Sequence, residues 1–272
     1  MLRAAVSALG LLVATPAFAQ PLRVVSLPDG EPRAVDTDSA AEAAFVALSM
    51  PAMLARVPAE ERAGLPERIA GAYARHHARS GPQPSIWAES VVGAPLVLRA
   101  GPEHAERAVI FLHGLGGSFT WPCGLVAEAS ARVGAMTFCP SLDADAHWAR
   151  APGRAVVRDT IALARRAGAT RIVLAGLSSG GVGASRLAMR LGDGIEGLIL
   201  LSGVDGALRA SQRVLLVHGD RDRMVQAESA RRFARRSTAA DLRMLEGGHF
   251  VLAERSDAIV ELIATWLTRL GA

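Results

Sequence analysis

The second half of the chain alternates between short, continuously apolar runs and longer runs in which apolar residues recur every three or four positions. The short runs have the length of buried strands, and the longer runs are typical of amphipathic helices. The predicted strands are 108–112, 135–139, 171–176, 195–201, 213–219 and 242–246, and the predicted helices are 120–133, 153–168, 180–191, 226–237 and 257–270. Continuous apolar strands separated by helices predict an α/β fold, with a mostly parallel sheet covered by helices on both faces.

The segment before this alternation has a different pattern. Residues 39–79 are rich in alanine, carry apolar residues at helical spacing and are divided by prolines, so they predict several short helices. These helices would either cover an edge of the sheet or pack across the cleft of the site as a cap. Next, 86–92 and 94–100 are two strand-like runs separated by Gly93, which predict an antiparallel hairpin.

The first residues of the chain have the three parts of a secretory signal peptide. Arg3 precedes an apolar run, and small residues follow at Ala17 and Ala19, so cleavage is expected after Ala19. The apolar run is too short to span a bilayer, and no later run is long enough. We therefore expect an exported protein, periplasmic or secreted, without a stable membrane anchor. The predicted organisation is a signal peptide at 1–19, a short N-terminal helical extension at 20–84 and an α/β catalytic domain at 85–272.

The charge and the missing residue types exclude several functions. The formal net charge is only +4 at pH 7, which is no signature of nucleic-acid binding, and arginine pairs on predicted helices are typical of solvated faces. The chain contains no lysine and no asparagine, which excludes Schiff-base lysines, phosphate-loop lysines and Asn side chains as oxyanion donors. No pattern of closely spaced histidines or cysteines suggests a metal site, and no cofactor is expected. Nothing in the sequence indicates the oligomeric state.

The two cysteines favour a disulfide over two buried thiols. Cys123 lies in the first turn of a predicted helix and Cys139 at the end of the next strand, and both positions lie at the same edge of a parallel sheet. An even number of cysteines in an exported chain also favours pairing.

The residues that directly follow the strands are where ligands bind in open α/β sheets. After the strand 171–176 the chain has the pattern G-x-S-x-G, with Ser178 between Gly176 and Gly180. A strand-to-helix turn with glycines on both sides exposes the central hydroxyl at a helix N-terminus, so Ser178 is the predicted nucleophile.

A serine needs a base to take its proton and an acid to orient that base. Of the seven histidines, His249 follows the last strand in a glycine-rich loop and is the predicted base. The other two histidines at strand ends, His113 and His218, are each followed by glycine, and we assign them a structural role in turns. Asp222 is the preferred acid, with Asp220 and Asp205 as alternatives.

Two backbone N–H groups are predicted to bind the oxyanion of a tetrahedral intermediate. One belongs to Ser179, which follows the nucleophile, and the other to Leu115 in the glycine-rich loop after the first parallel strand. Gly114 or Gly116 is the alternative to Leu115.

Three aromatic residues in loops at the same edge are candidates for binding the substrate. They are Trp121, His147 and Trp148, which would line an acyl pocket or simply contribute to packing.

The motifs IFLHGLGG, GLSSGG, LLVHGDRD and GGHF together resemble the α/β-hydrolase superfamily. The chain is most similar to its compact carboxylesterase and acyl-thioesterase branch, with dienelactone-hydrolase-like proteins nearby. The resemblance implies an α/β-hydrolase fold in which Ser178, Asp222 and His249 form the triad. Two features depart from this pattern: a long segment precedes the sheet, and 202–211 is too short to hold the lid that many members insert there.

These observations predict a serine carboxylic-ester hydrolase that forms an acyl-enzyme from a small-molecule acyl ester. A thioesterase or a small-peptide hydrolase would use the same three side chains, because the pocket decides the leaving group. The alternative that is not an enzyme is a non-catalytic binding scaffold in the cell envelope.

Overall fold

The computed structural model describes residues 23–26, 59–80, 96–116, 120–142 and 145–270. Its strands form one eight-stranded sheet in the order β1-β2-β4-β3-β5-β6-β7-β8. β2 runs antiparallel to both of its neighbours, and every other pair is parallel. The strands are β1 Arg23–Ser26, β2 Leu96–Ala100, β3 Arg107–Leu112, β4 Met136–Pro140, β5 Arg171–Leu177, β6 Gly197–Leu201, β7 Arg213–Gly219 and β8 Ala240–Leu245. The mostly parallel sheet predicted from the apolar runs is confirmed.

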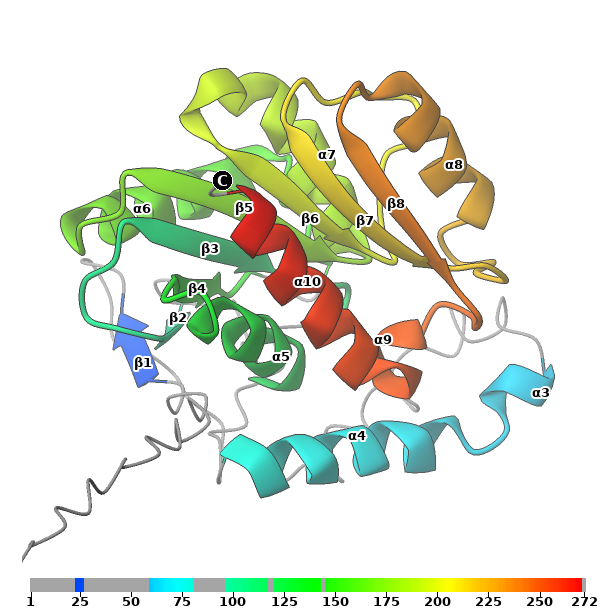
Figure 1. The fold of residues 1–272 in the computed structure, drawn as a ribbon. Helices are drawn as coiled ribbons and strands as arrows, with labels where there is room; N and C mark the ends of the chain where they lie inside the picture. Colours follow the sequence, from blue (N-terminus) through cyan, green and yellow to red (C-terminus); the bar gives the residue numbers. More distant parts are fainter. Residues whose placement is uncertain (1–22, 27–58, 81–95, 117–119, 143–144, 271–272) are drawn as a thin grey trace, which may run out of the picture.

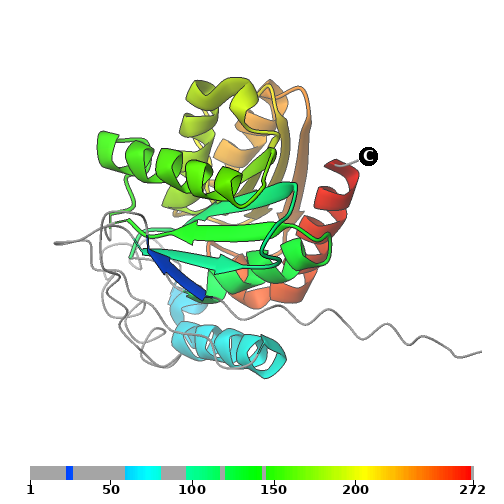
Figure 2. The same cartoon turned by 90° about the vertical axis from the view of Figure 1, so that its left-hand side faces the viewer.

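Helices cover both faces of this sheet, as Figures 1 and 2 show. Helices α6, α7 and α8 lie on one face, and α4, α5, α9 and α10 lie on the other. The helices are α3 Ala59–Arg62, α4 Leu65–Ser80, α5 Thr120–Ala131, α6 Ala151–Arg166, α7 Ser179–Leu191, α8 Ala227–Arg236, α9 Val251–Glu254 and α10 Ser256–Leu270, with the short 3₁₀ helix η1 at Gly192–Gly194.

The apolar runs of β3 to β7 are continuous because each of these strands contributes buried side chains to two cores. In β3, Val109 and Phe111 pack with α5 and α10, whereas Ile110 and Leu112 pack with the helices of the opposite face. All four side chains are almost completely buried. A strand buried on both faces has no position for a polar side chain, which explains the pattern seen in the sequence.

The first two strands differ from the predicted hairpin. The predicted partner of β2, residues 86–92, lies outside the described residues, but both edges of Leu96–Ala100 are already paired. On one side lies β4, and on the other lies β1 at Arg23–Ser26, a strand that the sequence analysis places inside the segment 20–84. The hairpin is therefore wrong for β2, because its antiparallel partner comes from much earlier in the chain.

The described part of the N-terminal segment packs against helices that follow His249 in the chain. Leu65 and Ile69 of α4 are buried in the core formed with α5 and α10. Arg68 Nε lies 3.2 Å from Glu254 Oε1 of α9, and Arg75 donates to the carbonyl oxygen of Ala253 at 3.4 Å. Within 39–79 the described residues begin at Ala59 and include the helices α3 and α4. The part of the prediction before Ala59 lies outside the described residues.

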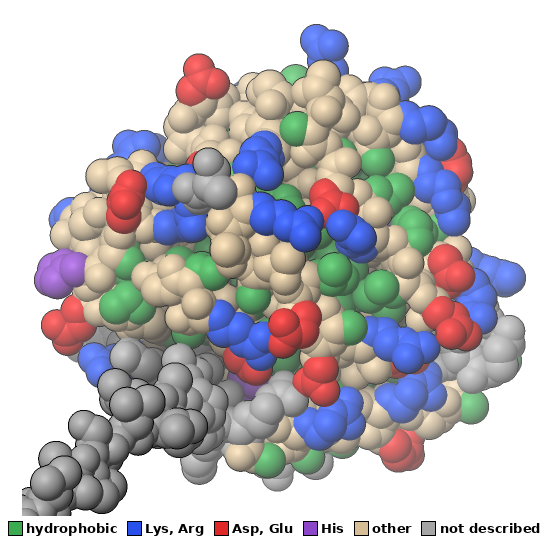
Figure 3. All heavy atoms as spheres, viewed as in Figure 1, with side chains coloured by type: hydrophobic (Ala, Val, Ile, Leu, Met, Phe, Trp, Pro, Cys, Tyr) green, Lys and Arg blue, Asp and Glu red, His purple; other side chains and the backbone are tan. Residues whose placement is uncertain are grey.

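The connection between β6 and β7 contains no lid. Residues 202–212 are all described and form only turns and bends. On the face of the molecule seen in Figure 3, arginine and acidic side chains are interspersed around small apolar patches. None of the described helices has the length and apolar character needed to cross a membrane. The predicted signal peptide lies outside the described residues.

Candidate active site

Ser178 lies in a strained turn between β5 and α7. Its φ of 53° and ψ of −119° place a non-glycine residue in a region that L-amino acids rarely occupy. The glycines beside it are required by close packing: a Cβ on Gly180 would lie 2.1 Å from the carbonyl oxygen of Leu112, and one on Gly176 would lie 2.4 Å from Gly180. The spacing of the G-x-S-x-G motif thus follows from contact between its two glycines and from contact of Gly180 with β3.

The structure brings the three predicted side chains together in hydrogen-bonding order. Ser178 Oγ lies 2.9 Å from His249 Nε2, and His249 Nδ1 lies 2.8 Å from Asp222 Oδ2. A carboxylate can only accept, so Nδ1 carries the hydrogen and Nε2 is left to accept the hydroxyl proton of Ser178. The serine comes from the β5–α7 turn, the aspartate from the loop after β7 and the histidine from the loop after β8.

Asp222 is buried and yet ionised. Its side chain is 4% exposed, and its Oδ1 accepts hydrogen bonds from the backbone N–H groups of Met224 at 2.9 Å and Val225 at 3.1 Å. Burial alone would raise the pKa of Asp222, but hydrogen bonds from His218 and His249 outweigh it and lower the pKa from 3.8 to about 2. The carboxylate is therefore available as an acceptor throughout the neutral pH range.

The alternative acids have other partners. Asp220 is exposed and accepts a hydrogen bond from the N–H of Gly247 at 3.0 Å, which fixes the loop that carries His249. Asp205 accepts a hydrogen bond from Arg186 at 2.8 Å. Of the three candidates, Asp222 is the one that the structure brings to His249.

The predicted oxyanion loop lies beside the serine. A Cβ on Gly114 would lie 3.4 Å from Ser178 Cβ, so the backbone of the loop approaches the nucleophile closely. Leu115 is half-buried in this loop, and Ser179 is the first residue of α7, where backbone N–H groups have no acceptor within the helix. Their role as oxyanion donors stays a prediction that this arrangement supports.

His113 holds the oxyanion loop in place. Its Nε2 accepts a hydrogen bond from the N–H of Leu142 at 2.9 Å, so its Nδ1 donates to the carbonyl oxygen of Gly114 at 2.7 Å. Its own carbonyl oxygen accepts from Trp148 Nε1 at 3.0 Å. The structural role predicted for His113 agrees with these contacts.

The aromatic residues proposed to line a pocket are placed differently from one another. Trp148 is fully buried, and its ring packs edge-on against His113 with 4.9 Å between ring centroids. It packs against His113 at the start of the predicted oxyanion loop, which agrees with the packing role given as the alternative for it. Contact of Trp148 with a substrate stays a prediction, and its burial does not support it. Trp121 is 6% exposed and belongs to the core around α5, whereas His147 is exposed. Substrate contact by these two residues stays a prediction.

Cys123 and Cys139 form the predicted disulfide, with 6.1 Å between their Cα atoms. The bridge joins the first turn of α5 to the end of β4, so it ties down the helix that follows the oxyanion loop.

Sequence reasoning missed the contact between His218 and the triad acid. His218 Nε2 lies 3.2 Å from Asp222 Oδ2, although the sequence analysis assigned this histidine to a turn. The available signal was the pattern HGDRD, which places a histidine four residues before the acid. Within the described residues, no group of His, Cys, Asp or Glu side chains could hold a metal ion.

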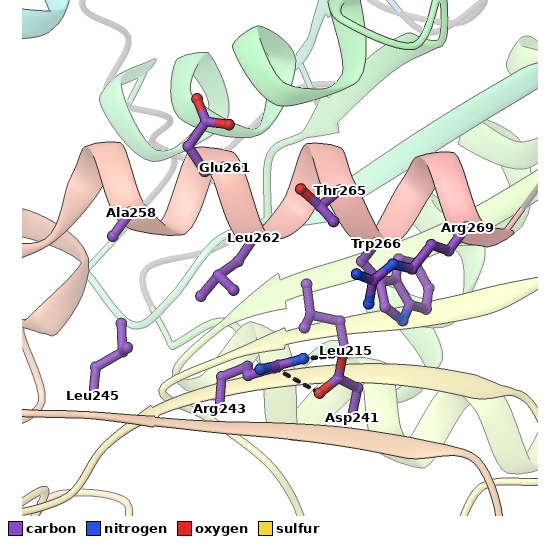
Figure 4. A pocket seen from close by; sticks show the side chains of 10 residues that line it. All are labelled: Leu215, Asp241, Arg243, Leu245, Ala258, Glu261, Leu262, Thr265, Trp266 and Arg269. Carbon is purple, nitrogen blue, oxygen red and sulfur yellow. Dashed lines mark hydrogen bonds and ion pairs between the residues drawn. The ribbon is translucent and has the colours of Figure 1, made fainter.

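A hollow of about 450 Å³ lies between α10 and the strands β7 and β8, as Figure 4 shows. Leu215, Leu245 and Leu262 line it, and so do Asp241 and Arg243, which form an ion pair with 2.7 Å between Arg243 Nε and Asp241 Oδ1. None of the three triad side chains lines it, so this hollow is distinct from the candidate active site.

Comparisons with known proteins identify the fold. No protein-family model and no curated protein matches the chain. Among solved structures, Est1E from Butyrivibrio proteoclasticus matches with a TM-score of 0.56 at 18% identity, over 68% of this chain and 98% of that chain.

Two further structures have comparable similarity. A mouse protein, α/β hydrolase domain-containing protein 10, matches with a TM-score of 0.53 at 13% identity, over 67% of this chain and 97% of that chain. An α/β serine hydrolase homologue from Coxiella burnetii matches with a TM-score of 0.52 at 20% identity, over 67% of this chain and 96% of that chain. The order of the strands, the turn at Ser178 and these similarities lead to one conclusion: the chain has the fold of the α/β-hydrolase superfamily.

Proposed function

We propose that this protein is a serine hydrolase that cleaves carboxylic esters through an acyl-enzyme. The observation that carries the proposal is the chain of hydrogen bonds from Ser178 through His249 to Asp222, at 2.9 and 2.8 Å. A serine at a strained turn, a base within hydrogen-bonding distance and a buried acid that orients the base are the parts that acyl transfer requires.

The reaction follows from these positions. Ser178 Oγ attacks the carbonyl carbon of the ester while its proton passes to His249 Nε2, and the resulting oxyanion accepts hydrogen bonds from the N–H groups of Leu115 and Ser179. The bond to the leaving alcohol then breaks as His249 returns the proton to the alcohol oxygen. Water attacks the acyl-enzyme, His249 takes a proton from it, and Ser178 regains that proton as the acid leaves.

The proposed substrates are esters with small or surface-presented acyl groups. The short connection at 202–212 supports this proposal, because a lid inserted there would be expected of an enzyme that is activated at a lipid interface. Est1E, which shares the fold, has been solved with ferulic acid bound. Aromatic acyl esters are therefore worth including beside aliphatic ones.

Action outside the cytoplasm is part of the proposal. The signal-like pattern of residues 1–19 and the disulfide between Cys123 and Cys139 support it, because structural disulfides persist in oxidising compartments. Fractionating cells that express the full chain tests this part: a periplasmic or secreted product that begins at Gln20 is expected, and an uncleaved cytoplasmic product would contradict it.

The activity is tested with p-nitrophenyl esters from acetate to palmitate and with methyl ferulate, using the mature, oxidised protein. Ser178→Ala is expected to lower kcat by several orders of magnitude. The matched control is Ser211→Ala, an exposed serine in the β6–β7 connection, which should leave kcat unchanged.

A fluorophosphonate probe separates the alternatives if every ester is inert. Labelling of Ser178 without ester hydrolysis would replace the ester proposal with thioester or amide cleavage. Absence of both labelling and hydrolysis would contradict a hydrolase and favour a binding scaffold.

A further inference from the structure

His218 lies in the interior of the protein, directly behind the acid of the candidate triad. It is the second-last residue of β7, its side chain is completely buried, and Asp222 is four residues further along the chain. Its Nε2 lies 2.8 Å from the carbonyl oxygen of Val225 and 3.2 Å from Asp222 Oδ2. One ring nitrogen thus faces two acceptors.

These contacts decide the protonation of the ring. A carbonyl oxygen cannot donate, so Nε2 must carry the hydrogen that both oxygens accept. A second hydrogen on Nδ1 would have no acceptor among the described residues, and a charged ring would be costly at a position without solvent. His218 is therefore a neutral donor, and its contact with Asp222 is a hydrogen bond rather than an ion pair.

With His218 included, the carboxylate of Asp222 is fully coordinated. Oδ2 accepts from His249 and His218, and Oδ1 accepts from the N–H groups of Met224 and Val225. Four donors match the four lone-pair sites of a carboxylate, so rotation of the group would break several hydrogen bonds at once. His218 also holds Val225 through its carbonyl oxygen, which fixes the loop that supplies two of the donors.

We infer that His218 is a positioning residue for the proposed reaction, which holds the Asp222 carboxylate in the orientation that receives His249. The inference rests on the proposed function, because it assigns His218 a part in the same proton transfer. His218 does not touch Ser178 or the substrate in this assignment. It acts through Asp222, whose proton affinity it lowers by donating to the oxygen that also binds His249.

Two changes follow if this donor is removed. Asp222 gains freedom to rotate, so the step in which His249 accepts the serine proton becomes slower, and kcat falls. Asp222 Oδ2 also becomes a stronger acceptor for His249, which favours the protonated imidazole and moves the acidic limb of the kcat/KM profile to higher pH. KM should hardly change, since no contact with substrate is lost.

The ionisable groups on the surrounding loops stay the same in every variant. They are Asp220 and Arg223, which are exposed, Arg221 and Glu246, which are 3.9 Å apart and exposed, and Glu254 at the end of α9. A difference between variants in the pH profile therefore reports on position 218.

The experiment compares His218→Leu, which removes the donor but keeps an apolar side chain, with His218→Gln, whose amide N–H₂ reaches near the position of Nε2. Leu216→Val is the matched control, because this residue is equally buried in β7 and packs in the core on the far side from α10. For each protein, kcat, KM, the pH profile of kcat/KM and the urea midpoint are measured.

For His218→Leu we expect kcat to fall about tenfold, the size of effect that loss of a hydrogen bond to a charged group produces. KM should stay constant and the acidic limb should move to higher pH, and His218→Gln should recover most of the loss. Leu216→Val should lower the urea midpoint and leave the pH profile unchanged. If His218→Leu also changes only the urea midpoint, the inference is overturned while the ester hydrolase stands.

NMR of isotope-labelled histidine side chains in the wild type provides a test that requires neither folding of a variant nor activity. The expected result is a ring of His218 that carries its hydrogen on Nε2 and has a bare Nδ1. A hydrogen on Nδ1 would contradict the inference. An inactive wild type that no fluorophosphonate labels would instead refute the proposed function, and the NMR result would still decide the state of His218.

Discussion

Replacing Asp222 with asparagine tests the electrostatics of the buried site, and Asp220→Asn is its matched control. Asparagine has the same shape as aspartate, but it carries no charge and presents two N–H hydrogens where the carboxylate presents only acceptors. Around Asp222 every neighbour is a donor, so the amide nitrogen would face another N–H group. Asp220 is exposed, and an amide oxygen can still accept its one hydrogen bond, from Gly247.

The size of the effect on stability follows from the pKa of Asp222. Burial raises this pKa, the hydrogen bonds from the two histidines lower it by more, and the net change from 3.8 to about 2 corresponds to about 2 kcal/mol at neutral pH. Because the folded-state pKa is depressed, this stabilisation is present above the unfolded-state pKa of 3.8. It is lost as pH falls through the folded-state pKa of about 2.

Urea denaturation at a series of pH values checks this prediction. The difference in unfolding free energy between wild type and Asp222→Asn should be largest at neutral pH. It should shrink by about 2 kcal/mol as the pH falls from about 4 to about 2, whereas Asp220→Asn should stay within about 0.5 kcal/mol of wild type. In parallel, kcat should drop by about 10⁴ for Asp222→Asn, because the base loses the partner that sets its tautomer. A pH-independent difference, or a larger loss of activity in Asp220→Asn, would refute the reasoning.

Four further predictions concern the scaffold. Reduction of the bridge between Cys123 and Cys139, which are 16 positions apart, should lower the unfolding free energy by roughly 3 kcal/mol in urea titrations; equal midpoints with and without reductant would exclude such a contribution. Gly180→Ala should abolish ester hydrolysis and soluble expression, because the new Cβ would lie 2.1 Å from a backbone carbonyl of β3. At Gly194 no described residue lies within 4 Å of an added Cβ, so Gly194→Ala should instead raise stability by about 0.4–1 kcal/mol. Glu196→Gln should cost about 1–3 kcal/mol in thermal or urea unfolding, since this mostly buried carboxylate lies between two arginines that begin β3 and β5; an unchanged midpoint would show that the arginines find other acceptors.

The sequence predicts the parallel part of the sheet well because its signal is local. Each strand from β3 to β7 is an apolar run of its own, and the turn at Ser178 is indicated by glycines that the packing requires. The strand β1 and its pairing with β2 escape this reasoning, although β2 itself is predicted at 94–100. The run Arg23–Ser26 is short, and its partner Leu96–Ala100 lies far along the chain, so no local pattern reveals that they pair.

The same limit applies to the site. Ser178, Asp222 and His249 each have a recognisable place after a strand, and the structure brings them to the positions expected. His218 lies near the end of β7 and Trp148 in the connection between β4 and α6, but their roles depend on where their rings point. A histidine four residues before an acid becomes its partner only because the loop between them turns back on itself.

The strand ends opposite the candidate site carry a set of stabilising contacts with α10. Three of the parallel strands begin with arginines whose guanidinium groups donate to the last carbonyl groups of α10. The pairs are Arg107 with Leu267 at 3.1 Å, Arg171 with Leu270 at 3.1 Å and Arg213 with Arg269 at 2.9 Å. Carbonyl groups at a helix C-terminus have no partner within the helix and carry partial negative charge, so these contacts satisfy them and stabilise the helix end.

Each of these strands therefore has a stabilising residue at its start and a residue of the candidate site just beyond its end. β3 leads to the oxyanion loop, β5 to Ser178 and β7 to the loop of Asp222. The helix α10 follows the loop of His249 in the chain, and its C-terminus is held by the arginines that begin β3, β5 and β7. These contacts therefore fix the C-terminal end of the chain segment that begins at the base. Substitutions of the three arginines should consequently lower the unfolding free energy while kcat of the folded protein is kept. Ser178→Ala, just beyond the end of β5, should instead lower kcat and leave the unfolding free energy close to that of the wild type.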